Sequence, residues 1–499
     1  MVSYTFTGLL GSTNPTFCTN ISDLEIAWIG GQPRLYSVTW PGVGAGYTAY
    51  DIGQVSGPAS LLALQGYSAA IHHLSPPQLA VFPAAAGAGF VIGAGMTPSG
   101  WASYALTASG GFGAALNSPL PFDPTAVTGA SIGGASYVFL ASDNYAQPVG
   151  YQLLANGTLQ SVGSFPLAGG GTAAINGLGM ASLGSEQFVL AASARYNAIS
   201  TYSVAPDGTL SAKATVSDTS GIGMSKPTTI GSLSQFGTTY VIANGTESSS
   251  LSVFRLQTGG GLLAVDHVVD NLTTRFAGAS AMATLQSGDR GYVVVGGSDG
   301  GVDLLTLLPD GRLIHLLTIA DSAAMSLDHV TALAIGQVAG QTKLFAASGT
   351  EPGITQITLN LGPQGIVVYG NVGVQNGTAA NDLLFAGAGT TALIGGGGDD
   401  ILVAGGNGSA AVMTGGTGSD IFVLSPGSGA LTITDYQPGI DRLDLTSFPM
   451  LRNMGQLSIN STASGADILY MSSTIHIQSL DGNPISANAF AQSQVLGLT

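Results

Sequence analysis

The sequence predicts an all-β protein: a seven-bladed β-propeller, then a short parallel β-roll, then a β-rich C-terminal cap. A unit of about 51 residues recurs through residues 20–370, and a glycine- and aspartate-rich nonapeptide recurs between Gly377 and Val423. Neither region shows helical periodicity. We therefore expect an N-terminal strand or arm at 1–19, the propeller at 20–370, the roll at 376–446 and the cap at 447–499.

The longer repeat is clearest in two copies, in which an apolar run is followed by an alternating run and a turn. These copies are Tyr137–Ser142 with Tyr151–Leu159, and Gln187–Ser193 with Tyr202–Leu210. Each unit offers four short β-rich runs, and periods of about 40–50 residues are typical of propeller blades. A string of β-sandwiches or a β-helix is the alternative. The predicted turn glycines, one for each blade, are Gly57, Gly110, Gly157, Gly208, Gly260, Gly311 and Gly365.

The turn segment Tyr202-Ser-Val-Ala-Pro-Asp-Gly-Thr-Leu210 resembles the blade motif of lactonase-type propellers related to phosphogluconolactonase. The resemblance covers only a short segment. Its Asp-Gly turn is not specific to this family, because hairpins in general favour Asp-Gly and Asn-Gly turns. It implies a hydrolase as one possible function. The sequence contains no H-E-x-x-H or P-loop motif and no convincing catalytic set, so no catalytic residues are predicted.

The nonapeptide pattern is G-G-x-G-x-D-x-U-x, where U is a large apolar residue. Glycine permits the tight turns that let backbone carbonyls converge on a hard cation, which takes about 6–8 oxygen ligands, and aspartate adds negative charge. The eighth position is predicted to point into a narrow core between two sheets. The residues at that position are Leu384, Leu393, Leu402, Val412 and Phe422.

This pattern resembles the repeats of RTX (hemolysin-type) calcium-binding proteins. In that family consecutive nonapeptides form opposite sides of a flattened coil, and Ca²⁺ lies between turns stacked on one side. The resemblance therefore implies one calcium-binding side, carrying Asp382, Asp400 and Asp420, and a metal-free side, carrying Thr391 and Ala410. The residues expected to form the calcium sites are Gly377, Asp382, Gly395, Gly396, Gly398, Asp400, Gly415, Gly418 and Asp420.

Two calcium sites are expected, between the Gly377 and Gly395 turns and between the Gly395 and Gly415 turns. Inserted residues at Ala404 and Thr414 lengthen the second interval and make the second site the weaker one. A glycine-rich flexible linker is the alternative interpretation. The segments Leu431–Tyr436 and Gly439–Thr446 resemble the sequence that closes RTX rolls. Their carboxylates, Asp435, Asp441 and Asp444, either form a further ion site or are structural.

Charge and composition exclude several classes of partner. The chain has 11 Lys plus Arg against 27 Asp plus Glu, a net charge of −16, which disfavours nucleic acid and anionic membranes. A single cysteine, Cys18, excludes an internal disulfide framework. The apolar stretch Leu79–Met96 is interrupted by Pro83 and glycines, so two adjacent buried strands are expected there instead of a transmembrane segment.

The N-terminal residues lack the basic and apolar regions of a Sec signal. Together with the RTX resemblance, this implies a bacterial protein exported by type I secretion machinery that recognises an uncleaved C-terminal signal. The expected location is extracellular or at the cell surface.

Polar residues are expected on one face of the propeller, where the loops leading into each blade meet the loops between its second and third strands. The predicted ligand-binding residues are Asp143, Tyr145, Arg195, Tyr196, Lys226, Arg275 and His329. Three basic residues on one rim suggest an anionic or sugar-like ligand, with Tyr145 and Tyr196 as stacking platforms. The alternative is that loops are simply where polar residues gather.

Three functions are consistent with these observations. The first is a secreted, calcium-binding protein whose propeller acts in adhesion or binds an unknown extracellular ligand, such as a glycan. The second is a lactonase-like hydrolase that uses a metal or an acid/base pair. The third is a structural protein that self-assembles at the cell surface. The lack of catalytic motifs favours the first over the enzyme.

Overall fold

A computed structural model of the chain describes residues 2–40, 46–67, 71–84, 87–97, 103–116, 120–142, 145, 147–163, 174–405, 412–426, 430–490 and 495–496. The chain divides into two compact units, and each is described by itself. The first comprises Tyr4–Asp270 and Thr274–Leu359. The second comprises Asn360–Thr499 together with Met1–Ser3 and Asn271–Thr273.

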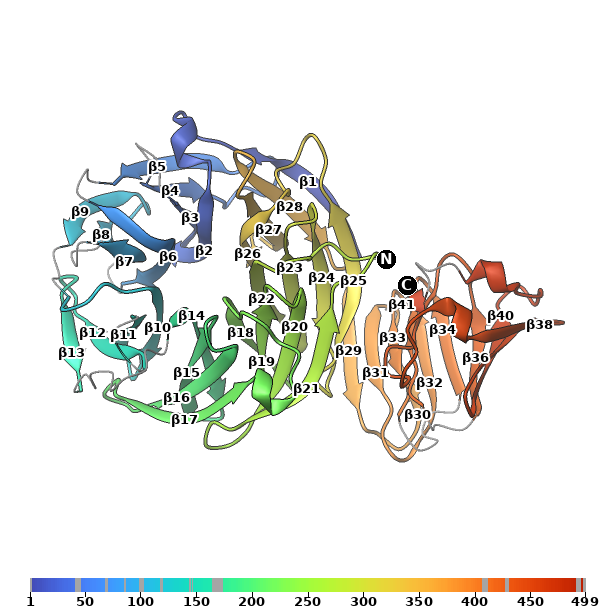
Figure 1. The fold of residues 1–499 in the computed structure, drawn as a ribbon. Helices are drawn as coiled ribbons and strands as arrows, with labels where there is room; N and C mark the ends of the chain where they lie inside the picture. The colour runs from blue at the N-terminus through green and yellow to red at the C-terminus, as the bar shows by residue number, and fades with distance from the viewer. Residues whose placement is uncertain are drawn as a thin grey trace. The chain divides into compact units, whose positions relative to one another are not determined.

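The first unit is a seven-bladed β-propeller, which confirms the predicted fold (Figure 1). Each blade is an antiparallel four-stranded sheet. From the innermost to the outermost strand, the blades are β2 Ile21–Ile29, β3 Gln32–Thr39, β4 Gly46–Asp51 and β5 Ser60–Gly66; β6 His72–Pro83, β7 Gly89–Thr97, β8 Ser103–Leu106 and β9 Phe112–Leu116; β10 Ala126–Ile132, β11 Ala135–Ala141, β12 Val149–Leu153 and β13 Leu159–Val162; β14 Ile175–Leu183, β15 Glu186–Ser193, β16 Ala198–Val204 and β17 Leu210–Ser217; β18 Ile230–Gln235, β19 Thr238–Gly245, β20 Ser250–Leu256 and β21 Leu262–Val269; β22 Ala281–Ser287, β23 Arg290–Gly296, β24 Gly301–Leu307 and β25 Leu313–Ala320; and β26 Val330–Val338, β27 Gln341–Ser348, β28 Ile354–Asn360 and β1 Ser3–Leu10.

The seventh blade takes its outermost strand from the N-terminus, because β1 pairs with β28. Residues that follow β28 are therefore not needed to complete the ring. Gly365, predicted as the turn glycine of this blade, lies instead in the first strand of the second unit, β29 Gln364–Tyr369. The prediction was wrong at this position because a repeat count cannot reveal which end of the chain supplies the closing strand.

The other turn glycines explain the sequence repeat. Gly208 and Gly311 have φ of +83° and +95°, and each donates its N–H to a carbonyl three residues earlier in a hairpin between third and fourth strands. An aromatic ring from the preceding blade lies beneath each glycine. A side-chain carbon at Gly208 would lie 2.3 Å from the ring of Tyr137, and one at Gly311 would lie 2.5 Å from the ring of Tyr240. The aromatic residue and the glycine are thus partners across blades.

The core of the propeller lies between adjacent blades. Second strands such as β11 and β15 are buried along almost their whole length because a neighbouring blade covers each face, which explains their continuous apolar sequence. The apolar stretch Leu79–Met96 forms parts of two paired strands, with Phe82 opposite Phe90, as expected. In the part of the chain that the structure describes, no helix has the length and hydrophobicity to cross a membrane.

The second unit is a β-solenoid with two sheets, most of whose strands are parallel. One sheet has the order β29 Gln364–Tyr369, β31 Asn381–Phe385, β33 Ile401–Val403, β35 Ile421–Val423, β37 Arg442–Asp444 and β41 Val495–Leu496; the other has the order β30 Gly373–Asn376, β32 Thr390–Gly397, β34 Val412–Thr417, β36 Ala430–Tyr436, β40 Ser473–Ser479, β39 Gly465–Tyr470 and β38 Ser458–Thr462. The last two strands of the second sheet are antiparallel. Short 3₁₀ turns lie at Pro15–Phe17, Asp218–Ser220, Met454–Gln456 and Ala487–Ala489.

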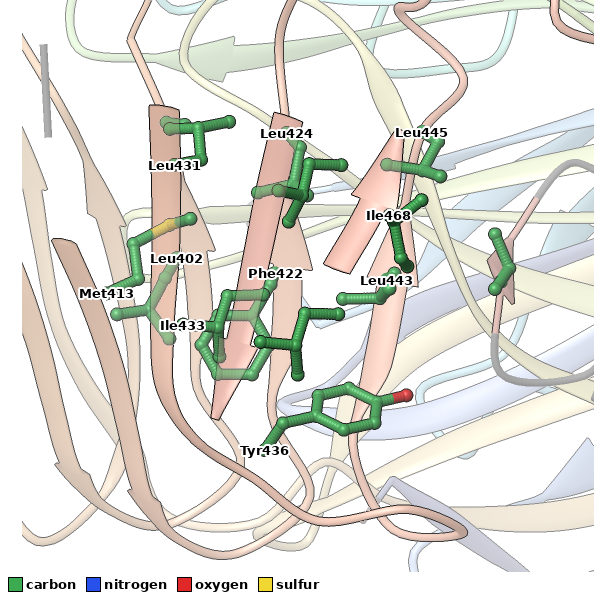
Figure 2. Close-up of a cluster of buried hydrophobic side chains, with 14 of the residues drawn as sticks. Leu402, Met413, Phe422, Leu424, Leu431, Ile433, Tyr436, Leu443, Leu445 and Ile468 are labelled. Atoms are coloured by element: carbon green, nitrogen blue, oxygen red, sulfur yellow. The ribbon is translucent and has the colours of Figure 1, made fainter. Parts of the chain in front are cut away.

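The solenoid core lies between its two sheets (Figure 2). Leu402 and Phe422 are buried at neighbouring positions of β33 and β35, as predicted. Val412 is an exception, because it is 38% exposed and Met413 fills the core beside Leu393. The C-terminal segment belongs to the same core through Ile468, Ile475, Ile477, Ile485, Phe490 and Val495.

Candidate functional site

Four buried aspartates form a ladder along one side of the solenoid. The carboxylate Oδ1 of Asp400, Asp420 and Asp441 accepts a hydrogen bond from the backbone N–H of the aspartate one turn earlier, and that of Asp382 accepts from the N–H of Ile366 at 2.6 Å. Asp382 N–H donates to Asp400 at 2.7 Å, Asp400 N–H to Asp420 at 2.9 Å, and Asp420 N–H to Asp441 at 3.0 Å. None of the four is more than 1% exposed. The three aspartates predicted to share one side do so, and Asp441 adds a fourth that the repeat pattern did not include.

The second oxygen of each carboxylate differs along the ladder. Asp382 Oδ2 accepts the backbone N–H of Thr378 at 2.5 Å, and the Thr378 hydroxyl also lies within 3.1 Å of both carboxylate oxygens. Asp420 Oδ2, in contrast, is buried and has no hydrogen-bond partner among the described residues. An unpaired buried carboxylate oxygen is costly, so this position is suited to a cation.

Glycine is required beside these carboxylates because a side chain would fill the space in front of them. A side-chain carbon at Gly395 would lie 2.2 Å from Asp400 Oδ2 and 2.5 Å from the carbonyl oxygen of Gly415. One at Gly415 would lie 2.2 Å from Asp420 Oδ2, and one at Gly377 would lie 2.1 Å from the carbonyl oxygen of Gly395. Carboxylate and carbonyl oxygens thus converge at the predicted glycines, and oxygen is the ligand that Ca²⁺ prefers.

Three other predicted glycines shape the turns between these positions. Gly396, Gly398 and Gly418 all have positive φ, at +108°, +98° and +138°. A side-chain carbon at Gly418 would lie 2.0 Å from the carbonyl oxygen of Gly398. Successive turns therefore stack with their backbones in close contact, which only glycine permits.

The ladder stays in register across the longer repeat. Gly396 pairs with Gly416 and Ile394 with Thr414, so Thr414 is an ordinary strand residue and was wrongly predicted to be an insertion. The extra residues therefore fall, in the sequence, between Val403 and Val412, which are the paired positions on either side. The step from Asp400 to Asp420 therefore keeps its geometry. The step from Asp382 to Asp400 departs from the pattern, because the backbone N–H and hydroxyl of Thr378 already form hydrogen bonds with the Asp382 carboxylate.

Burial raises the pKa of the last two aspartates of the ladder, Asp420 and Asp441. Burial and the nearby carboxylates of Asp441 and Asp435 raise the pKa of Asp420 to about 7, and burial raises the pKa of Asp441 to about 6. Across the described residues, no group of three or more His, Cys, Asp or Glu side chains could hold a metal. A site of the predicted kind does not need such a group, because backbone carbonyls supply most of its ligands.

The closing segment uses its carboxylates for backbone hydrogen bonds. Asp435 accepts from the N–H groups of Gly415 and Gly416 at 2.9 and 2.7 Å, and Asp441 Oδ2 accepts from Gln437 N–H at 2.8 Å. Asp444 accepts from the backbone N–H of Thr446 at 2.9 Å. These contacts favour the structural interpretation of the three residues.

On the propeller, the two predicted sets of loops do meet on one face. The Lys226 N–H donates to Asn197 Oδ1 at 2.8 Å, and the Asp328 N–H donates to Glu351 at 3.2 Å. Lys226, Arg275 and His329 are exposed, as are Arg195 and Tyr196, whose guanidinium and ring lie 5.6 Å apart. Asp143 lies outside the described residues.

Two features of this face differ from a cationic binding rim. Tyr145, predicted as a stacking platform, is only 6% exposed and packs edge-on against Phe122, so it is a core residue. Acidic residues also balance the rim's positive charge. Lys226 forms an exposed ion pair with Glu247 at 3.4 Å, and His329 lies 3.5 Å from Asp328.

A cavity of about 1310 Å³ lies among the innermost strands of all seven blades. Asp23 and Glu25 of β2 line it, and of the predicted ligand-binding residues only Lys226 does so. Asp23 accepts the N–H of Leu79 at 2.9 Å and Glu25 accepts the N–H of Val81 at 3.0 Å, both from the open edge of β6. Sequence reasoning missed this pair. Its only signal is two acids at alternate positions of a strand, which usually marks a solvent-facing edge.

Comparison with known proteins finds only distant structural similarity. No protein-family model and no curated protein matches the chain. Among solved structures, the periplasmic gluconolactonase of Pseudomonas aeruginosa is 18% identical, with a TM-score of 0.43, and the match covers 63% of this chain and 92% of that one. A putative 6-phosphogluconolactonase from Bacteroides fragilis is 13% identical, with a TM-score of 0.43 and coverages of 64% and 91%. A protein from Lactobacillus plantarum is 14% identical, with a TM-score of 0.44 and coverages of 66% and 99%.

Proposed function

We propose that this chain is an extracellular calcium-binding protein in which the solenoid is ordered by Ca²⁺ and the propeller serves as a binding module. The observation that carries the proposal is the buried ladder of Asp382, Asp400, Asp420 and Asp441, with glycine carbonyls facing its carboxylates. Stacked buried carboxylates repel one another, and a divalent cation between turns would remove that cost.

The favoured site lies between the Asp400 and Asp420 turns. Support for this choice comes from the unpaired Asp420 Oδ2 and from the glycines at 395 and 415, which leave room for an ion. The step from Asp382 to Asp400 is the second candidate, weakened because Thr378 already satisfies Asp382. This ranking reverses the one based on the inserted residues.

The extracellular location follows from the affinity expected of such a site. Extracellular calcium modules typically bind at about 10⁻⁴–10⁻³ M, so the site would fill outside a cell and stay empty inside one. We propose that export uses type I secretion machinery, in keeping with the RTX resemblance. On the propeller, the exposed Arg195, Lys226 and Arg275 remain candidates for contact with an anionic extracellular ligand.

Calorimetric titration of the full chain tests the calcium proposal. CaCl₂ added to chelator-treated protein should give saturable binding in the submillimolar to millimolar range, and MgCl₂ should bind much more weakly because the site offers flexible carbonyl ligands. The absence of saturable calcium binding would overturn the proposal.

A further inference from the structure

Several polar side chains on the inner wall of the propeller form hydrogen bonds between neighbouring blades. Ser22 Oγ donates to the carbonyl of Pro77 at 2.7 Å, Thr125 Oγ1 to that of Ile175 at 2.9 Å, and Thr331 Oγ1 to that of Ile21 at 2.6 Å. Each bond links the start of one innermost strand to the next blade. These hydroxyls line the cavity, but their hydrogen atoms are already committed.

Asp23 and Glu25 are different because they bring negative charge to the same cavity. Each uses one oxygen to accept a backbone N–H of β6, and Asp23 uses its other oxygen to accept the N–H of Leu24 at 2.9 Å. Among the described residues, the remaining oxygen of Glu25 has no hydrogen-bond partner. Burial raises the pKa of Asp23 to about 7, and burial and the Asp23 charge raise that of Glu25.

Two other acids of the propeller face a basic group. Asp51 pairs with Arg34 at 2.9 Å, and Asp303, which is fully buried, lies 2.8 Å from His315. Among the described residues, no ion pair joins Asp23 or Glu25 to a basic side chain. Lys226, which also lines the cavity, pairs with Glu247 instead. The cavity therefore holds two carboxylates without the positive charge that accompanies such groups elsewhere in this unit.

We propose that the central cavity binds a small organic cation, whose ammonium or guanidinium group lies against Asp23 and Glu25. Apolar side chains of the same wall, including Val127, Leu178 and Leu333, would contact its hydrocarbon body. A metal ion is disfavoured, because no third carboxylate or imidazole joins the pair among the described residues. The cavity volume is ample for a ligand of this size.

The inference rests on the proposed role of the propeller as a binding module, but not on calcium. A matched pair of probes tests it on the full chain: benzylamine, which is charged at neutral pH, and benzyl alcohol, which has the same ring without the charge. Wild-type protein should bind benzylamine at one site, about tenfold or more tightly than benzyl alcohol, because only the amine makes charge-assisted hydrogen bonds. Equal affinity for the two probes would overturn the proposal.

The variant Asp23→Asn/Glu25→Gln keeps carbonyl oxygens that can accept the N–H groups of Leu79 and Val81. It should lower the preference for benzylamine to about one, whereas Asp289→Asn, at an exposed hairpin, should leave the preference unchanged. An unchanged preference in the double variant would show that the pair is purely structural. If circular dichroism shows that the double variant does not fold, the same preference is measured for Glu25→Gln alone and compared with that of the wild-type protein.

The titrations are run once with chelator and once with calcium. A benzylamine preference without any calcium binding would retain this inference and remove the calcium proposal. Calcium binding without the preference would do the reverse.

Discussion

The propeller and the solenoid treat buried carboxylates in opposite ways. In the propeller, the buried Asp303 lies beside His315 and the partly exposed Asp51 beside Arg34, so the chain itself supplies a basic side chain as partner for each. In the solenoid, Asp400 and Asp420 stack on one another, and their hydrogen bonds come from backbone N–H groups. Under the calcium proposal, this difference predicts that the propeller is stable by itself and that the solenoid needs a cation from solution.

Of the substitutions that test this difference, Asp400→Ala is expected to have the largest effect on ion binding and stability. Asp400 belongs to both candidate calcium sites, so the variant should lose two ions. At a calcium concentration one hundred times Kd, each lost ion costs about 2.7 kcal/mol, or about 5 kcal/mol in all. Calorimetric stoichiometry and thermal unfolding in calcium measure the loss. Thr391→Ala, at an exposed position on the opposite side, is the control and should change neither. An unaltered ion count in the Asp400 variant would contradict the assignment.

The second effect concerns the propeller cavity. The pKa of Asp23 is raised from 3.8 to about 7 in the folded protein, so the folded state binds this proton more tightly than the unfolded state. Stability from this group is therefore fully present below about pH 4 and is lost as the pH rises to about 7. The loss is at most about 4 kcal/mol.

Denaturant unfolding of wild type and Asp23→Asn across this pH range measures that contribution. The variant should show a flatter pH profile, and Asp289→Asn should retain the wild-type slope. Parallel profiles for wild type and Asp23→Asn would mean that the Asp23 carboxyl is solvated in the folded protein.

These two regions also show what the sequence could and could not predict. The blades were predictable because several copies carry both the aromatic residue and the turn glycine that meet across a blade interface, as Tyr240 and Gly311 do. The ladder was predictable because Asp382, Asp400 and Asp420 recur with the same spacing of glycines. Both signals are local, and each is repeated.

The sequence did not predict features that depend on packing between segments distant in the chain. The packing of consecutive blades brings β2 beside β6, so the role of Asp23 and Glu25 could not be read from alternating acids in one strand. The burial of Tyr145 against Phe122 likewise depends on packing between segments. Val412 was assigned to the core because one of the two extra residues, Thr414, was placed after it, whereas both precede it.

A smaller effect is expected from Gly415→Ala in the solenoid. Its new methyl group would meet Asp420 Oδ2 at 2.2 Å, and crowding of this kind costs about 1–3 kcal/mol. Gly397→Ala is the matched control, because its methyl group would meet only the Thr417 hydroxyl, at 3.2 Å, and an alanyl carbon at 3.6 Å. Thermal unfolding of the solenoid compares them. Equal melting temperatures would show that the turn can relax around the carboxylate.

The smallest effect is expected from Tyr240→Phe in the propeller. The Tyr240 hydroxyl donates to the carbonyl of Pro309 at 2.7 Å in a buried contact between blades. Its removal should lower the free energy of unfolding by about 1 kcal/mol, with or without calcium. Tyr196→Phe, at an exposed ring, should be neutral. A calcium-dependent cost for Tyr240→Phe would break the proposed independence of the two units.

Hydrogen exchange with and without chelator tests the central claim most directly. Residues 377–445 should be well protected in calcium and exchange much faster in chelator, because the stacked carboxylates repel one another without the ion. The strands of the propeller should show the same protection in both conditions. Equal protection of residues 377–445 in calcium and in chelator would contradict the account.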